Sequence, residues 1–128
     1  MREISILFRV ELYVDDIEKS LDFYENIIGL KLYGRNERCG RFNYDCFSLL
    51  ITAKTALEKD HYFFTKAKTD IKGNGFELII VVDELENVYE RCRKHNILPE
   101  VDIEKYPWAM RGFKISDPDG YFLRITSK

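Results

Sequence analysis

The stretch Leu12-Tyr13-Val14-Asp15-Asp16-Ile17-Glu18 decides how this chain folds, because it returns as Ile80-Val81-Val82-Asp83-Glu84-Leu85-Glu86. The second copy follows the first by 68 residues, counted from Val14 to Val82. A second pair of similar stretches, Leu49–Lys54 and Leu123–Lys128, is separated by 74 residues. Two matches in the same order and at nearly the same separation indicate an internal repeat. We therefore predict that the 128-residue chain contains one structural unit twice.

The first copy is predicted to be a strand followed by a helix. Apolar residues alternate with polar or aromatic ones from position 9 to 14, which is the period of a half-buried strand. Asp15 or Asp16 can then cap a helix, because a carboxylate accepts hydrogen bonds from the free N–H groups of a first helical turn. Gly29 can end this helix. The helix carries one apolar stripe, made of Ile17, Leu21, Tyr24 and Ile28.

The second copy repeats this pattern. Residues 77–82 are predicted to be the corresponding strand, with Leu78, Ile80 and Val82 on one face and Glu77, Ile79 and Val81 on the other. Asp83 is the candidate cap of the helix that follows. Asn96, which tolerates a positive φ, is a suitable helix stop. The predicted apolar stripe of this helix is Leu85, Val88, Tyr89 and Cys92.

Three shorter strands are expected after each helix. In the first half they are placed near 31–36, 42–47 and 48–52, and in the second near 101–105, 111–116 and 121–126. Asp117-Pro118-Asp119-Gly120 predicts a tight turn before the last strand. The expected organisation is a single domain over 1–128, with a first unit at about 4–54, a linker at about 55–75 and a second unit at about 76–128. We expect a helical turn around His61–Lys68 in this long linker.

Composition sets limits on partners and compartment. Apolar residues make up 45% and charged residues 33% of the chain, as in an ordinary soluble globular protein. The formal net charge of −2 argues against nucleic acid or an anionic membrane as a partner. The three cysteines lack metal-site spacing and are interpreted as free thiols in a reducing compartment. With no signal peptide and no apolar run long enough to cross a bilayer, the expected location is the cytoplasm.

Several motifs resemble those of one known family. Val14–Tyr24, closing at Gly29-Leu30, is similar to the first strand and helix of the vicinal oxygen chelate superfamily, which includes glyoxalases, extradiol dioxygenases and bleomycin-resistance proteins. Pro107–Phe113, followed by Asp117–Tyr121, resembles the Trp-containing strand and Asp-Pro-Asp-Gly turn of its bleomycin-resistance-like branch. The duplicated βαβββ unit is also typical of this superfamily, and the resemblance covers essentially the whole chain.

The resemblance implies an α+β fold in which two tandem βαβββ units form a curved mixed sheet around a cavity, with the helices on its outer face. Strand alternation then predicts which side chains point into the cavity, because neighbouring residues face opposite sides of a sheet. The candidate ligand-binding residues obtained in this way are Arg9, Glu11, Tyr13, Glu77, Trp108, Met110, Phe122 and Arg124.

Catalytic members of the superfamily hold a divalent metal at four positions, early in each unit's first strand and in each unit's last strand. Carried over to this sequence, these positions are Arg9, Leu50, Glu77 and Arg124. Only Glu77 could be a ligand, because arginine is cationic and leucine has no lone pair. The sequence therefore predicts no metal and no cofactor. A pair of inward glutamates, Glu11 and Glu77, is the remaining case for a metal and makes a weak site.

The resulting functional hypothesis is a metal-independent small-molecule-binding protein of the glyoxalase/bleomycin-resistance type, with an aromatic or anionic ligand in the cavity. One alternative is a metal-free enzyme with Glu77 or Glu11 as general base. Others are a metal-dependent glyoxalase-like lyase and a module without a ligand. Arg9, Glu77 and Arg124 form either a ligand site or a structural ion pair. The expected partners are a small molecule and a second copy of the chain in a homodimer.

Overall fold

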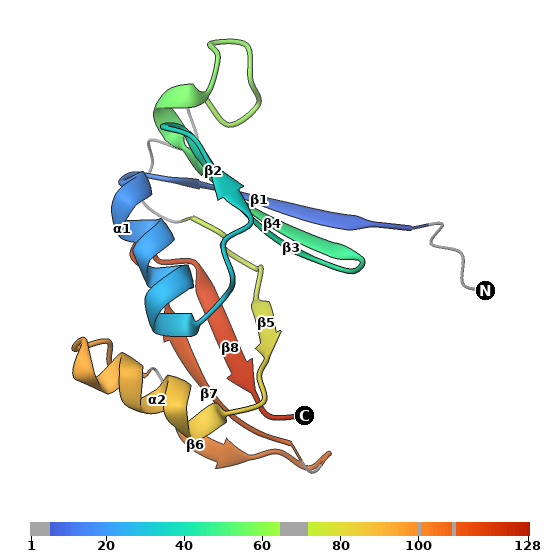
Figure 1. The fold of residues 1–128 in the computed structure, drawn as a ribbon, viewed down its shortest axis with the longest axis vertical. Coiled ribbons are helices and arrows are strands. Elements are labelled where there is room, and N and C mark those ends of the chain that lie inside the picture. Colours follow the sequence, from blue (N-terminus) through green and yellow to red (C-terminus); the bar gives the residue numbers. More distant parts are fainter. Residues whose placement is uncertain (1–5, 65–71, 100, 109) are drawn as a thin grey trace. The chain divides into compact units, whose positions relative to one another are not determined.

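The computed structural model describes residues 6–64, 72–99, 101–108 and 110–128. The chain divides into two compact units. Unit 1 comprises Met1–Glu25 and Leu30–Asp70, and unit 2 comprises Asn26–Gly29 and Ile71–Lys128. Each unit contains one mixed four-stranded sheet (Figure 1), so the predicted α+β fold of two βαβββ units is confirmed.

The sheet of unit 1 has the strand order β1-β4-β3-β2. Strand β1 (Phe8–Val14) runs parallel to β4 (Phe47–Ala53), and β3 (Cys39–Tyr44) is antiparallel to both β4 and β2 (Gly34–Arg35). Leu12 and Val14 are buried, whereas Arg9 and Glu11 are exposed, as the alternation predicts.

The sheet of unit 2 repeats this topology in the order β5-β8-β7-β6. Strand β5 (Leu78–Val81) is parallel to β8 (Phe122–Thr126), and β7 (Arg111–Ser116) is antiparallel to β8 and to β6 (Val101–Lys105). The core of this sheet lies on one face, where Phe113, Ile115, Leu123 and Ile125 are fully buried.

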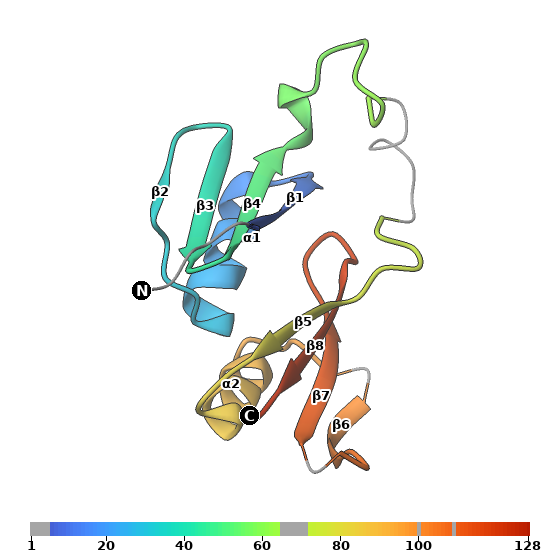
Figure 2. The same ribbon diagram turned by 90° about the vertical axis from the view of Figure 1, so that its right-hand side faces the viewer.

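One helix covers one face of each sheet (Figure 2). In unit 1, α1 (Ile17–Asp22) is followed by a π-helical segment, η1 (Phe23–Ile28), of which Phe23–Glu25 belong to unit 1. The ring of Tyr24 meets that of Phe42 on β3. In unit 2, α2 (Leu85–Lys94) buries Leu85, Val88 and Cys92, and Tyr89 packs edge-on against Phe113 of β7. Leu21, Tyr24 and Ile28, and Leu85, Val88 and Cys92, are buried as predicted, whereas Ile17 and Tyr89 are only half-buried. Phe23 and Ile27 are also buried, in the π-helical segment that a 3.6-residue period does not describe.

The predicted caps are only partly correct. Asp16 caps α1, since its carboxylate accepts a hydrogen bond from the N–H of Lys19, and Asn96 ends the second helix with a φ of 60°. The prediction that Asp83 caps α2 is wrong: Glu84 holds the N-cap position without a side-chain bond. The carboxylate of Asp83 instead forms an ion pair with the ammonium of Lys128, at 2.7 Å, and does not bond to the backbone of the helix.

The strand bounds of the second half agree better with prediction than those of the first. Strands β6 and β7 have the predicted bounds, and β8 begins one residue late, after the Asp117–Gly120 turn, where Gly120 takes a φ of 94°. In the first half, the side chain of Asn36 accepts hydrogen bonds from the N–H groups of Arg38 and Cys39, which forms a turn. Strand β2 is therefore only two residues long, and β3 begins at Cys39, three residues earlier than predicted. A turn at residues 45–46 lets Phe47 begin β4.

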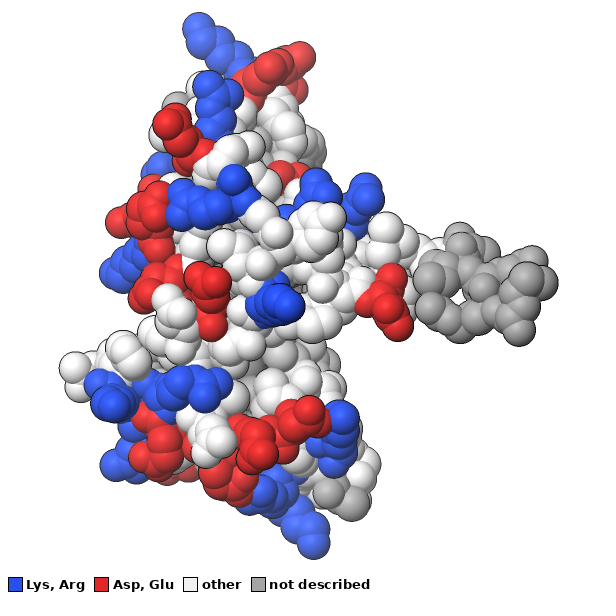
Figure 3. Space-filling model, viewed as in Figure 1, with Lys and Arg blue, Asp and Glu red and all other residues white. Residues whose placement is uncertain are grey.

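The segment between the units contains a 3₁₀ helix, η2 (Lys54–Ala56), followed by turns up to residue 64. The helical turn expected around His61–Lys68 falls partly outside the described residues. Over the described ranges, no helix combines the length and apolar character needed to cross a membrane. On the face drawn in Figure 3, acidic and basic side chains are interspersed and neither sign forms a continuous patch.

Candidate functional site

In unit 2, alternation along the strands places a set of polar side chains on the face of the sheet opposite the buried core. Lys114 and Arg124 are register partners on β7 and β8, and so are Gly112 and Thr126, and Ser116 and Phe122. Side chains of register partners lie on the same side of a sheet. Glu77 precedes β5, whose Ile79 is the register partner of Arg124. We call the face formed by Glu77, Lys114, Phe122, Arg124 and Thr126 the polar face of unit 2.

An ion pair joins two of these residues. The Nε atom of Arg124 is 3.2 Å from Oε2 of Glu77, and the two side chains are 20% and 33% exposed. The contact is electrostatic, because Nε does not have the alignment of a hydrogen bond to any described residue. Partial burial reduces solvent screening, so this pair is held more firmly than an ion pair on an open surface.

Two aromatic rings lie against the other side of the Arg124 guanidinium. Tyr106 and Trp108 are stacked, with their centroids 5.0 Å apart and their planes inclined by 15°. The Cζ atom of Arg124 is 5.6 Å from the centre of the Tyr106 ring and 6.0 Å from that of Trp108. These distances are within the range of cation–π attraction. The guanidinium is therefore fixed in position by a carboxylate and by two rings.

Tyr106 is buried, with only 8% of its surface exposed. A side chain at Gly112 would put its Cβ 3.0 Å from Cε2 of Tyr106, so the glycine provides the space in which this ring lies. Burial raises the pKa of the Tyr106 hydroxyl, the carboxylate of Glu104 adds to this effect, and the Arg124 guanidinium opposes it. The hydroxyl is thus a neutral hydrogen-bonding group beside a fixed cation.

A pocket of about 500 Å³ adjoins this cluster. Glu77 and Phe122 form part of its lining, together with Lys72, Gly73, Asn74, Gly75, Phe76 and Gly120. The ammonium of Lys72 is 2.7 Å from the Asp119 carboxylate, so its charge is already compensated. The pocket therefore presents two aromatic rings, those of Phe76 and Phe122, and the carboxylate of the ion pair.

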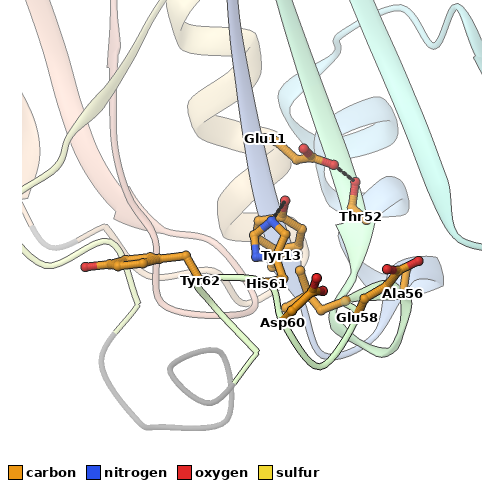
Figure 4. Close-up of a pocket in the computed structure, with 9 residues that line it drawn as sticks. Glu11, Tyr13, Thr52, Ala56, Glu58, Asp60, His61 and Tyr62 are labelled. Atoms are coloured by element: carbon orange, nitrogen blue, oxygen red, sulfur yellow. Dashed lines mark hydrogen bonds between the residues drawn. The ribbon is translucent and has the colours of Figure 1, made fainter.

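Unit 1 has a pocket of its own, of about 520 Å³, beside the ends of β1 and β4 (Figure 4). Glu11 accepts a 2.6 Å hydrogen bond from the hydroxyl of Thr52, which is the register partner of Tyr13 on β4. The hydroxyl of Tyr13 is 3.3 Å from Nε2 of His61, whose ring also meets that of Tyr13 edge-on. Glu58, Asp60 and Tyr62 complete the polar lining.

The predicted site residues are therefore divided between the two units. Arg9, Glu11 and Tyr13 lie on β1 of unit 1, with Arg9 exposed. The other five predicted site residues lie in unit 2, where Met110 and Phe122 are half-buried and Trp108 is 55% exposed. A cluster that joins Arg9 to Glu77 and Arg124 stays a prediction.

Sequence reasoning did not select Tyr106 or His61. Tyr106 and Trp108 lie in the turn that follows β6, where strand alternation gives no signal for their positions. His61 lies in the segment between the two units. Its contact with Tyr13 depends on the path of a loop, for which the sequence gives no periodic signal.

Comparison with known proteins identifies the family. The model of the Glyoxalase/Bleomycin resistance protein/Dioxygenase superfamily matches residues 6–125. This chain belongs to that superfamily. It is 33% identical to proteins named lactoylglutathione lyase from two Neisseria meningitidis strains, over 95% of this chain and 90% of theirs.

Solved structures of the superfamily share the fold at low sequence identity. A lactoylglutathione lyase from Agrobacterium tumefaciens aligns with a TM-score of 0.71 at 17% identity, covering 98% of this chain and 95% of that one. A glyoxalase-related enzyme from Fulvimarina pelagi aligns with a TM-score of 0.75 at 18% identity, covering 98% and 89%. These likenesses concern the fold, which hosts many different activities in different proteins.

The metal site of catalytic superfamily members does not fit the residues of this chain. Two of the four corresponding positions, Arg9 and Arg124, are cations that repel a divalent ion, and Leu50 is apolar. The carboxylate of Glu77 is already paired with Arg124. Within the described ranges, no group of three or more His, Cys, Asp or Glu side chains is arranged to hold a metal.

Proposed function

We propose that this superfamily member is a metal-independent small-molecule-binding protein, with an aromatic or anionic ligand on the polar face of unit 2. The observation that carries the proposal is the fixed guanidinium of Arg124, held by Glu77 at 3.2 Å and by the rings of Tyr106 and Trp108. A guanidinium fixed in this way can bind a ligand oxygen without losing side-chain entropy on binding.

The charges on this face are nearly balanced. Lys114 stands directly opposite Arg124, and like charges in such a position repel each other. Glu77 adds a carboxylate, and Glu104, the register partner of Gly112, adds another on the same side. Because the face is close to neutral, selectivity is expected to depend on ring stacking and hydrogen bonding as much as on net charge.

The ligand ring has a surface on which to stack. Trp108 is 55% exposed, and an exposed indole beside a cation favours contact with flat molecules. The pocket of about 500 Å³ beside Glu77 and Phe122 offers room for a small ligand at the edge of the same face. These features support binding and do not define a reaction.

Calorimetric titration with benzoate tests this proposal, because benzoate joins a flat ring to a carboxylate. The wild-type chain is expected to bind benzoate, and Arg124→Leu is expected to weaken binding by about tenfold or more. The matched control is Arg111→Leu, which removes an arginine of the same sheet that is paired instead with Glu86 of α2. This control should bind benzoate like the wild type.

Thermal unfolding of the same variants separates ligand binding from a structural role. The Glu77–Arg124 pair is partly exposed, so Arg124→Leu should lower the free energy of unfolding by no more than about 1 kcal/mol. No benzoate binding by the wild type, or equal binding by Arg124→Leu, would contradict the proposal. A large loss of stability without a change in binding would show that the pair is structural.

A second candidate function is that of a lactoylglutathione lyase, favoured by the name of the relatives that are 33% identical to this chain. An assay of that reaction with added Zn²⁺ or Ni²⁺ tests it. We expect no turnover above that of a metal-free control, since only Glu77 of the four corresponding residues could be a ligand. Turnover that requires added metal would favour the lyase over the binding protein.

A further inference from the structure

The pocket of about 520 Å³ in unit 1 has a wall of aromatic rings. Tyr13, His61 and Tyr62 belong to its lining, and the ring centroids of Tyr13 and His61 are 5.4 Å apart. The ring of Phe63 meets all three, with its centroid 5.8 Å from those of Tyr13 and His61 and 5.1 Å from that of Tyr62. Ring contacts of this kind are favourable, so the wall is a connected aromatic cluster.

Hydrogen bonds fix the ring of His61 and leave it without a positive charge. Its Nδ1 accepts a hydrogen bond from the N–H of Phe63 at 3.0 Å, so this nitrogen carries no proton. The ring proton is therefore on Nε2, which donates to the hydroxyl of Tyr13 at 3.3 Å. The imidazole is thus a neutral part of the aromatic wall, with both of its nitrogens engaged.

The charged side chains in the lining are all acidic. They are Glu11, Glu58 and Asp60. Glu11 accepts the hydrogen bond of Thr52, and among the described residues none of the three carboxylates has a cationic partner. The ammonium of Lys54, close to the lining in the sequence, is instead 2.9 Å from the carboxylate of Asp15. In the view of Figure 4, carboxylates lie above and below the two contacting rings.

Rings and spread carboxylates together restrict the ligand. A divalent metal needs several oxygen ligands in direct contact, and in the described part of the chain no group of three His, Cys, Asp or Glu side chains is gathered for this. A larger cation with a diffuse charge has no such need. It can lie within about 6 Å of a ring centroid and be balanced by carboxylates at longer distances. A pocket of about 520 Å³ has room for a small organic molecule.

We propose that the pocket of unit 1 binds a small organic cation of the alkylammonium class. The rings of Tyr13 and His61 contact the cationic group, and the carboxylates of Glu11, Glu58 and Asp60 balance its charge. This site does not depend on the function proposed for unit 2, because all of its residues lie in unit 1 and its ligand is a cation.

Calorimetric titration of the wild-type chain compares choline with dimethylbutanol, its neutral isostere in which a tert-butyl group replaces the trimethylammonium group. Choline should bind, and the isostere should bind about tenfold more weakly or not at all, because it lacks the charge that the rings and carboxylates attract. Ca²⁺ at matched ionic strength should not displace choline. No binding of choline, equal binding of the isostere, or displacement by Ca²⁺ would overturn the proposal.

Glu58→Gln tests the carboxylates, because it removes one charge and keeps the shape of the side chain. We expect choline affinity to fall about twofold to fivefold, the effect of one exposed charge on a cation. The matched control is Glu25→Gln, the same substitution at an exposed residue of η1 that does not line the pocket. This control should bind choline like the wild type. Equal losses in both variants would show a general effect of net charge and would contradict the assigned site.

Tyr13→Leu and Tyr13→Phe test the aromatic wall. Tyr13→Leu removes the ring and should weaken choline binding about threefold or more, and Tyr13→Phe, which keeps a ring, should weaken it less. Tyr62→Leu provides a second test at a residue that is 72% exposed and therefore outside the core. Thermal unfolding checks that each variant is folded. If folded Tyr13→Leu and Tyr62→Leu both bind choline like the wild type, the rings do not hold the cation and the proposal is wrong.

Discussion

The guanidinium of Arg124 is in contact with a carboxylate at 3.2 Å and with two rings at 5.6 and 6.0 Å. Each contact is modest in water, and their combination holds the charge in one orientation. A fixed cation on this face favours a ligand oxygen and disfavours a divalent metal. Arg124 is therefore the basis of both parts of the proposed function, namely the binding of a ligand oxygen and the independence from a metal.

The three cysteines differ in surroundings and should differ in reactivity. Cys92 is buried on α2, and burial raises the pKa of its thiol to about 11, although Arg91 opposes the shift. Because only the thiolate reacts, we expect Cys92 to resist a disulfide reagent at pH 8, while the exposed Cys46 reacts within seconds to minutes. Counting modified thiols over time, with and without denaturant, measures this.

The raised pKa of Cys92 also has a consequence for stability. Below about pH 7.5 the thiol is protonated in both the folded and the unfolded chain. As the pH rises toward 11, the unfolded chain releases this proton first, so the contribution of Cys92 to stability is lost. Cys92→Ala should remove this part of the alkaline decrease in melting temperature. Rapid labelling of Cys92 in the folded protein would contradict the assigned burial.

At the scale of the element, the caps of the two helices offer a test by matched substitutions. Asp16 accepts a hydrogen bond from Lys19 N–H at 3.1 Å, so Asp16→Ala should lower the free energy of unfolding by about 1 kcal/mol. Asp83 is in the corresponding turn of the second unit but is paired with Lys128 on the surface. Asp83→Ala should therefore change stability by less than about 0.5 kcal/mol. Equal effects in urea unfolding would contradict the described caps.

The elements that alternate or carry an apolar stripe could be predicted from sequence, because burial on one side imposes a period. Strands β6 and β7 and the stripe of α2 follow this rule. The bounds of β2 and β3 could not be predicted in the same way. They depend on hydrogen bonds from Asn36 to the backbone of Arg38 and Cys39, which no hydrophobic pattern encodes.

The residues of the candidate site that lie on strands could be predicted from the sequence, whereas those on turns and loops could not. Alternation places Arg124 and Phe122 on the face opposite Leu123 and Ile125, and the ion pair of Arg124 with Glu77 is found there. The stacking of Tyr106 on Trp108 occurs in a turn, where alternation stops. The contact of His61 with Tyr13 depends on a loop. The contacts made by side chains on turns and loops could therefore be found only in the structure.

At the scale of the whole molecule, the sheet edges suggest self-association. Strands β1 and β5 lie at the edges of their sheets. Phe8 on β1 is 66% exposed and Val81 on β5 is 50% exposed. Apolar side chains on an unpaired edge favour pairing with another chain. We expect a homodimer, and analytical ultracentrifugation at micromolar concentration should give about twice the mass of the chain.

Charged substitutions at these edges provide the control. Phe8→Lys or Val81→Lys should weaken the dimer while leaving each fold intact, because both side chains are exposed and outside the core. Dissociation into monomers would be seen as a lower sedimentation coefficient. A wild-type chain that sediments as a monomer at micromolar concentration would show that these edges have another role.

The metal content of the purified protein tests the central claim most directly. After dialysis against trace Zn²⁺ and Ni²⁺, elemental analysis by mass spectrometry should find far less than one divalent ion per chain. The physical reason is that Arg9 and Arg124 occupy two of the four positions that hold a metal in catalytic members of the superfamily, and that Glu77 is paired with Arg124. One tightly bound ion per chain would contradict the account.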